Sequence, residues 1–208
     1  MEDLLDLYAE PQDPARPVVC LDELPKQLLA DVRQPLPACP GMPAREDYEY
    51  ERRGVKNVFL WCEPLAGRRH IEVTDHRTMR DWAHCIKDLV DVHYPEVSVI
   101  RLVCDNLNTH RLASLYLAFS PTEARRIARK IELHHTPKHG SWLNAAEIEL
   151  AILSTQCLGR RIPDMDTLRT EAAAWEAERN ERCMTVDWHF TADNARHKLK
   201  HLYPSYSS

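Results

Sequence analysis

The sequence lacks the features that would place the protein in a membrane or outside the cell. It has no run of about 18 apolar residues, so no transmembrane helix is predicted. Its first ten residues, MEDLLDLYAE, are acidic and contain no basic region that could begin a secretory signal peptide. The seven cysteines include no C-x-x-C pair, and Cys20, Cys62 and Cys104 stand in apolar, strand-like runs. We therefore expect buried free thiols in a reducing cytoplasm, and neither a disulfide framework nor a membrane partner.

The charge distribution gives two opposing indications about nucleic acid. The 208 residues are 44% hydrophobic and 28% charged, which suits a folded chain with a core, as one large domain or two small ones. The net charge of −5 argues against nucleic-acid binding. Residues 101–140, however, hold seven Lys and Arg against three Asp and Glu, together with four His. Such a segment either attracts phosphate groups or forms an ordinary solvated surface.

The apolar pattern predicts a mixed sheet with helices packed on it. Short apolar or alternating runs, bounded by Pro and Gly, predict antiparallel strands in the first part of the chain, with a turn at Gly54. From Met79 onward, apolar residues recur at helical spacing, and helices alternate with strands, which indicates an α/β architecture. The expected strands are 17–21, 47–52, 55–62, 68–74, 97–104 and 131–135, and the expected helices are 79–90, 121–130, 140–157, 165–175 and 191–202.

Two apolar runs end on an aspartate, at Asp22 and Asp105. Adjacent strand ends lie about 5 Å apart in a sheet, so the two carboxylates face each other if the strands are parallel neighbours. A third acid could come from the helix after Gly140, where Glu147 and Glu149 both stand among apolar residues. Helical spacing does not choose between them. Three carboxylates at one end of a sheet would form a hard-oxygen site for Mg²⁺ or Mn²⁺, and two such ions suit phosphoryl transfer.

Three longer motifs surround these acids. They read VCLDE at residues 19–23, VCDNLNTH at residues 103–110 and TPKHGSWLNAAE at residues 136–147. The motifs resemble the catalytic blocks of DDE transposases, and more narrowly those of the bacterial insertion-sequence branch of the mariner-like superfamily. The resemblance implies a ribonuclease-H-like fold, a mixed sheet with helices on both faces. It also implies a catalytic domain at 17–204, between an N-terminal extension at 1–16 and a tail at 205–208.

The resemblance also implies roles for individual residues. The family's Leu-Asn-x-x-Glu falls on residues 143–147, so the resemblance favours Glu147 over Glu149 as the third catalytic acid, beside Asp22 and Asp105. These acids would hold two Mg²⁺ ions, for which Mn²⁺ would substitute, with Asp22 bridging the pair. The implied reaction is hydrolysis of a phosphodiester at a transposon end, followed by strand transfer into target DNA. The residues expected to orient the acids or to contact DNA are Asn106, Asn108, His110, Lys138, His139, Trp142 and Asn144.

Ordinary structural roles stay open for several residues in these motifs. His110 also suits a polar turn, and Trp142 also suits a position in the core. His134, His135 and His139 lie close together in the sequence, but no Cys or His partner stands at the spacing of a structural zinc site.

The sequence departs from the family pattern at its N-terminal end. Only 21 residues precede Asp22, too few for the helix-turn-helix module with which such transposases read transposon ends. We therefore expect an isolated catalytic domain, a truncated copy or one product of a split gene, with DNA and either a second copy of itself or a full-length transposase as partners. The alternatives are a ribonuclease-H-like nuclease without strand transfer, and a truncated, non-catalytic remnant that binds DNA or acts as a dominant-negative partner.

Overall fold

The structure, a computed structural model, describes residues 1–34, 36–45 and 47–203. The predicted tail at 205–208 lies outside the described residues. Within the described part, no helix combines the length and the apolar character needed to cross a lipid bilayer.

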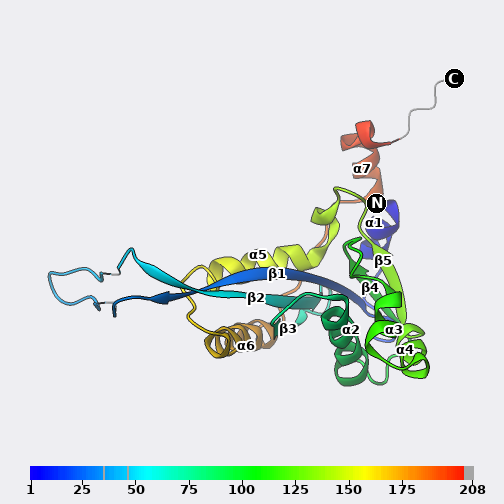
Figure 1. Ribbon diagram of the computed structural model, residues 1–208. Coiled ribbons are helices and arrows are strands. Elements are labelled where there is room, and N and C mark those ends of the chain that lie inside the picture. Colours follow the sequence, from blue (N-terminus) through cyan, green and yellow to red (C-terminus); the bar gives the residue numbers. More distant parts are fainter. Residues whose placement is uncertain (35, 46, 204–208) are drawn as a thin grey trace.

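A five-stranded sheet in the order β3-β2-β1-β4-β5 forms the centre of the molecule (Figure 1). β1 and β2 pair antiparallel, as do β2 and β3, whereas β4 runs parallel to both β1 and β5. The mixed sheet predicted from the sequence is therefore confirmed. The strands are β1 (Val18–Asp31), β2 (Tyr50–Glu63), β3 (Arg68–Thr74), β4 (Ile100–Cys104) and β5 (Ile131–His135).

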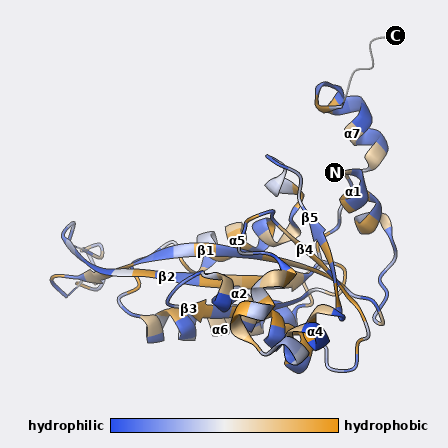
Figure 2. Ribbon diagram, turned by 45° about the vertical axis from the view of Figure 1, so that its right-hand side comes forward, coloured by the Kyte–Doolittle hydropathy of each residue, from blue (hydrophilic) through white to orange (hydrophobic). Residues whose placement is uncertain are grey.

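Helices cover both faces of this sheet, as predicted (Figure 1). α5 (Ala145–Gln156) packs on one face, α2 (Met79–Asp88) and α4 (Pro121–Ala128) pack on the other, and α6 (Met165–Glu181) packs along β3. Figure 2 shows hydrophobic colour on the central strands near β4 and mixed colour on the surrounding helices. The remaining elements are α1 (Glu2–Ala9), a π-helix (Leu89–His93), α3 (Leu115–Ala118), α7 (Ala192–Lys198) and 3-10 turns at Leu112–Ser114, Ser141–Leu143 and Lys200–Leu202.

The central strands are buried because helices shield them from both sides. Every residue of β4 is buried, as is typical of a parallel strand that is covered on both faces. Along β1 successive side chains alternate, so Cys20 faces the core under α5 whereas Val19 and Leu21 face the core under α2. All seven cysteines are free, and Cys20, Cys62 and Cys104 are buried as predicted.

The outer halves of β1 and β2 form an arm that extends beyond the rest of the sheet (Figure 1). The prediction of a turn at Gly54 is wrong, because Gly54 lies inside β2, which pairs with β1 as far as Tyr50 and Asp31. Gly54 has a φ of 87°, and the register of the two strands shifts opposite it, between Gln27 and Leu29. A glycine adopts this left-handed conformation without strain, so it forms a bulge here and the chain does not reverse.

The segment 1–16, which we predicted as an extension, begins with α1. Leu4 and Leu5 of this helix are buried in the core under α5. The Tyr8 hydroxyl donates a hydrogen bond to the Leu143 carbonyl at 2.8 Å. α1 therefore supports the turn that leads into α5.

A buried ion network holds α5 against β3 and α6. The Glu149 side chain is 1% exposed, and its Oε2 lies 3.0 Å from Nε of Arg69, which is equally buried. Arg179 completes the network with two hydrogen bonds to the same carboxylate, at 2.8 and 3.1 Å. Burying a charge costs free energy unless the charge is paired, so removing one member of the network would leave another buried and unpaired.

We predict that Glu149→Gln lowers the free energy of unfolding by about 3–5 kcal/mol, because it leaves Arg69 buried without a carboxylate. Urea unfolding followed by circular dichroism measures the change. Glu178→Gln is the matched control: it breaks an exposed pair with Arg182, and a surface pair contributes only about 0–1 kcal/mol. If both variants lose the same free energy of unfolding, the buried network contributes no more to stability than an exposed ion pair.

Candidate active site

β1 and β4 bring two of the predicted catalytic acids to the same level of the sheet. Their last parallel pair joins Cys20 to Val103, so Asp22 and Asp105 each follow that pair by two residues. Asp105 comes directly after β4, as predicted. The prediction that Asp22 ends its strand is wrong, since β1 continues as far as Asp31. The register nevertheless sets both acids on neighbouring strands, which lie about 5 Å apart.

Asn144 connects the third motif to Asp22. Its Oδ1 caps α5 by accepting the Ala146 N–H at 3.2 Å. Its Nδ2 donates to the Leu21 carbonyl at 2.9 Å and to the Asp22 carboxylate at 3.2 Å. Short polar residues are favoured as N-caps because they satisfy the free N–H groups of the first turn. Asn144 is fully buried and uses its amide within the protein, which favours a positioning role over contact with DNA.

Glu147 and Glu149 occupy different surroundings, although they stand two residues apart. Glu147 lies in the first turn of α5, where its N–H donates to the Asn144 carbonyl at 3.0 Å, and it is half-buried. Glu149 is engaged by Arg69 and Arg179 in the core. Of the two acids that helical spacing left open, Glu147 is therefore the one placed on the same turn as the Asn144 cap.

His110 holds Asp105 from the opposite side of the sheet. The imidazole is 1% exposed, and its Nδ1 bonds to the Asp105 carboxylate, while its Nε2 lies 3.0 Å from the carboxylate of Glu23. The ring of Trp82 stacks on it with centroids 5.9 Å apart. This burial favours the predicted orienting role for His110 over direct contact with phosphate. Glu23 was not predicted, and its position directly after Asp22 is the only sequence signal for it.

The surroundings shift the pKa values of Asp22 and Asp105 in opposite directions. Burial raises the pKa of the Asp22 carboxyl to about 7, and the negative charges of Glu23 and Asp105 add to this rise. The charge of Glu147 acts on Asp22 in the same direction. Burial also disfavours ionised Asp105, but the hydrogen bond and the charge of His110, together with the hydrogen bond from the Leu107 N–H, outweigh burial and lower the pKa of Asp105. Burial disfavours charged His110, but its bonds to Asp105 and Glu23 raise the pKa of the imidazole to about 12. Asp105 and His110 therefore form an ion pair, whereas Asp22 titrates near neutral pH.

The donor set of the three acids fits a hard divalent cation. Asp22, Asp105 and Glu147 offer carboxylate oxygens, which Mg²⁺ and Mn²⁺ prefer. Burial and like charge raise the pKa of Asp22, and a bound cation would favour the ionised carboxylate and so oppose both effects. Among the described residues, the ligand atoms of these acids do not all gather within 4.8 Å of one another, and one oxygen of Asp105 is engaged by His110.

Two loops with exposed polar residues leave the sheet beside the acids. β4 and β5 are parallel, with Cys104 paired to His135, so the loops after them emerge at the same edge. Trp142 is 43% exposed, with its ring edge-on to Phe190, so it is not the core residue that one interpretation allowed. The predicted DNA-contact residues that these loops expose are Asn106, Asn108, Lys138, His139 and Trp142.

Comparisons with known proteins agree with this geometry. The model of a family described as DDE superfamily endonuclease matches residues 17–169, about three quarters of the chain. A comparison with curated proteins finds no match. Among solved structures, the Mos1 mariner paired end complex with Mn is similar with a TM-score of 0.57 and 17% identity, over 88% of this chain and 55% of that one.

Two further Mos1 structures give the same result. The Mos1 transposase paired-end complex with left transposon end matches with a TM-score of 0.58 and 16% identity, over 88% of this chain and 58% of that chain. The Mos1 Strand Transfer Complex matches with a TM-score of 0.54 and 16% identity, with the same coverage. The chain thus spans a little over half the length of these proteins. At such identities the likeness shows the fold, and it confirms the predicted ribonuclease-H-like architecture.

We predict that Asp22→Asn stabilises the metal-free protein at pH 8 but not near pH 4. An acid whose pKa is raised by folding disfavours the folded state once the pH exceeds its unfolded value of 3.8. This destabilisation grows up to about pH 7 and stays constant above it. Removing it should raise the free energy of unfolding at pH 8 by on the order of 2 kcal/mol, allowing for screening. Urea unfolding in EDTA at the two pH values measures the effect.

Asp105→Asn serves as the control of opposite sign. It breaks the ion pair with buried His110, so at pH 8 it should destabilise the protein. If Asp22→Asn proves less stable than the native protein at pH 8, the ionised Asp22 carboxylate does not destabilise the folded state.

Proposed function

The chain belongs to the DDE superfamily of endonucleases, and we propose that it is the catalytic domain of a transposase from the bacterial insertion-sequence branch of the mariner-like superfamily. Its reaction would be hydrolysis of a phosphodiester at a transposon end, followed by attack of the freed 3′-hydroxyl on target DNA. The observation that carries this proposal is the register of β1 and β4, which sets Asp22 level with Asp105. Asn144 ties the first turn of α5, and with it Glu147, to Asp22.

The protein's own groups prepare the site for metal-dependent phosphoryl transfer. Asp22, Asp105 and Glu147 would hold the ions. With two Mg²⁺ ions, or Mn²⁺ in their place, held by these acids, the site would have the means to activate a water and to neutralise charge on the phosphate. Asp105 is already ionised because His110 is paired with it, and Asn144 fixes one oxygen of Asp22 by a hydrogen bond. The residues therefore contribute position and charge rather than a covalent nucleophile.

The proposed substrate is DNA, both as transposon ends and as target. The exposed loops after β4 and β5 place polar and basic side chains at the edge of the sheet where the acids lie. The similar Mos1 structures are described as a complex with left transposon end, a pre-cleavage transpososome and a strand transfer complex. These descriptions concern Mos1, and they support DNA as the substrate class proposed for this chain.

We predict that the protein nicks duplex DNA with Mg²⁺ or Mn²⁺. Alanine at Asp22, Asp105 or Glu147 should each lower the rate at least about 100-fold, as expected when a group that stabilises the transition state is lost. Glu149→Gln should keep its activity under conditions where circular dichroism shows it folded, and Glu178→Gln, on an exposed helix surface, should match the native rate. An inactive Glu149→Gln that is folded and binds metal would reverse the choice between the two glutamates.

The same preparation separates transposase from nuclease. Supplied with pre-cleaved ends that carry a 3′-hydroxyl and with a target plasmid, a transposase domain should produce joined products. Nicking without joined products would favour a nuclease on the same fold. DNA binding without either reaction would identify a non-catalytic remnant.

We predict that Lys138→Ala weakens DNA binding equally for all sequences and makes the dependence of log affinity on log salt shallower by about 1, because one phosphate contact is lost. Lys138 is exposed in the loop after β5. Fluorescence anisotropy over a salt series measures the slope. Lys200→Ala near the C-terminal end provides a matched control, and the proposed interface is wrong if that change, but not Lys138→Ala, alters the slope.

A further inference from the structure

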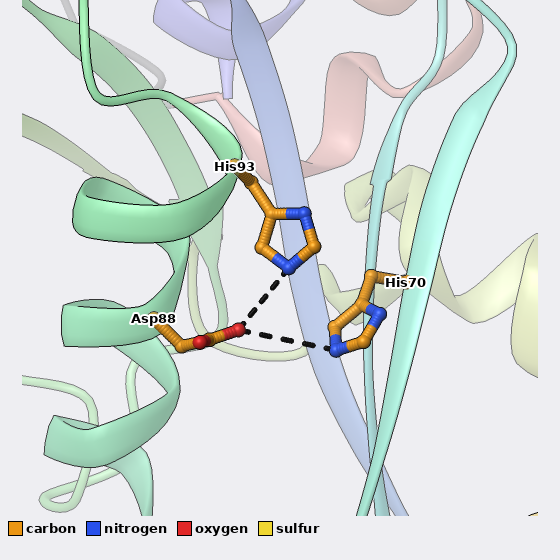
Figure 3. Close-up of side chains that lie close together, drawn as sticks. All are labelled: His70, Asp88 and His93. Carbon is orange, nitrogen blue, oxygen red and sulfur yellow. Dashed lines mark hydrogen bonds and ion pairs between the residues drawn. The ribbon is translucent and has the colours of Figure 1, made fainter.

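A second group of possible metal ligands lies on the opposite face of the sheet from Asp22. His70 of β3, Asp88 at the end of α2 and His93 of the π-helix converge there (Figure 3). His70 pairs across the sheet with Trp61, which pairs with Leu21, and these residues share the α2 face. We call this group the His70–Asp88–His93 cluster.

The ligand atoms of the cluster are close enough to share one ion. Nε2 of His93 lies 3.1 Å from Oδ2 of Asp88, and Nε2 of His70 lies 4.0 Å from the same oxygen. All three atoms lie within 4.8 Å of one another. Ligands about 2.0–2.1 Å from a tetrahedral zinc ion are separated from one another by roughly 3.3 Å. The 3.1 Å distance is close to this separation, and a small movement of His70 would shorten the 4.0 Å distance toward it.

The π-helix is what brings His93 beside Asp88. The two residues are five apart, and in an α-helix such residues point in clearly different directions. Here the Tyr94 N–H bonds to the Leu89 carbonyl at 3.0 Å, which closes the wider π turn. Single π turns within helices occur frequently at functional sites. The π turn therefore places the His93 side chain beside Asp88, where a regular α-helix would turn it away.

Neighbouring side chains already orient the two imidazoles. Nδ1 of His70 bonds to Glu176 at 3.1 Å, and the other oxygen of Glu176 accepts the Ile71 N–H at 2.8 Å. Histidines that bind metals usually engage a carboxylate in this way through their second nitrogen. The ring of Trp61 meets that of His93 edge-on at 4.8 Å and lies 5.9 Å from that of His70. Both Nε2 atoms are therefore left to point toward Asp88 (Figure 3).

We propose that the His70–Asp88–His93 cluster binds one first-row divalent transition-metal ion of the Zn²⁺ class. Two imidazoles and one carboxylate suit Zn²⁺ and its neighbours, whereas Mg²⁺ prefers a set of oxygen ligands. The site is separate from the three acids, which lie at the end of β4 and on the α5 face.

The cluster leaves a coordination position open toward solvent. It lines an open pocket of about 790 Å³ between β3, α2 and α6. Three protein ligands with an open fourth position are typical of reactive zinc sites, whereas structural zinc sites use four protein ligands. A water or a small anionic ligand would complete the shell from the pocket.

Isothermal titration with Zn²⁺, in an excess of Mg²⁺ that occupies the acids, tests the proposal. The native protein should bind one Zn²⁺ per chain at this site with micromolar affinity. Asp88→Asn and His93→Gln should each weaken binding by more than about 100-fold, and Glu176→Gln by roughly 10–100-fold, as expected for an outer partner of a ligand. The visible absorption of bound Co²⁺ gives a second readout that shows imidazole coordination directly.

Two controls separate this site from others. His84→Gln changes a histidine that lines the same pocket outside the cluster, and Asp105→Asn changes the acid site, so both should bind Zn²⁺ like the native protein. Circular dichroism in EDTA confirms that each variant is folded. The proposal is overturned if the native protein binds no Zn²⁺, or if Asp88→Asn and His93→Gln bind it with native affinity.

Discussion

The short parallel ladder between β1 and β4 is the constraint on which the proposed chemistry depends. Its last pair, Cys20 with Val103, sets the level at which Asp22 and Asp105 follow. Because side chains alternate along a strand, a slip of one residue would turn Asp22 to the opposite face. The ladder resists such a slip because both faces of β4 are buried, and a shifted β1 would exchange the residues of two separate cores.

Asp22 and Asp105 lie at the same level of the sheet, but the side chains that bond to them come from opposite faces. Asn144, on the α5 face, bonds to Asp22 and leaves it without a cation, so burial keeps its pKa near neutral. His110 reaches Asp105 from the α2 face and provides a positive charge. Charge in the site is therefore only partly balanced within the protein. Burial and the neighbouring negative charges raise the pKa of Asp22, and a cation beside its carboxylate would oppose that rise.

The sequence predicts the parts of this arrangement that local patterns encode. The apolar run of β4 ending at Asp105 follows from burial, and a helix after Gly140 follows from apolar periodicity, although α5 begins only at Ala145, after a 3-10 turn and the Asn144 cap. The outer half of β1 was not predicted, because polar residues interrupt its apolar pattern and pairing with β2 holds it, whereas β2 was expected as two strands, 47–52 and 55–62. The contact of His110 with Glu23 could not be predicted either, because it joins the loop after β4 to β1 and depends on which face of β1 Glu23 occupies. The His70–Asp88–His93 cluster has no sequence signature, because it depends on one π turn and on the neighbouring edge strand.

Helix α2 contacts both the acid site and the cluster. Trp82, near its start, stacks on the imidazole that holds Asp105, and Asp88, at its end, belongs to the cluster. The Asp22 carboxylate instead accepts a hydrogen bond from Asn144, the N-cap of α5, which also donates to the Leu21 carbonyl. α2 therefore supports the imidazole that orients Asp105 and also supplies one ligand of the proposed metal site, whereas the Asp22 side chain is held from the opposite face of the sheet.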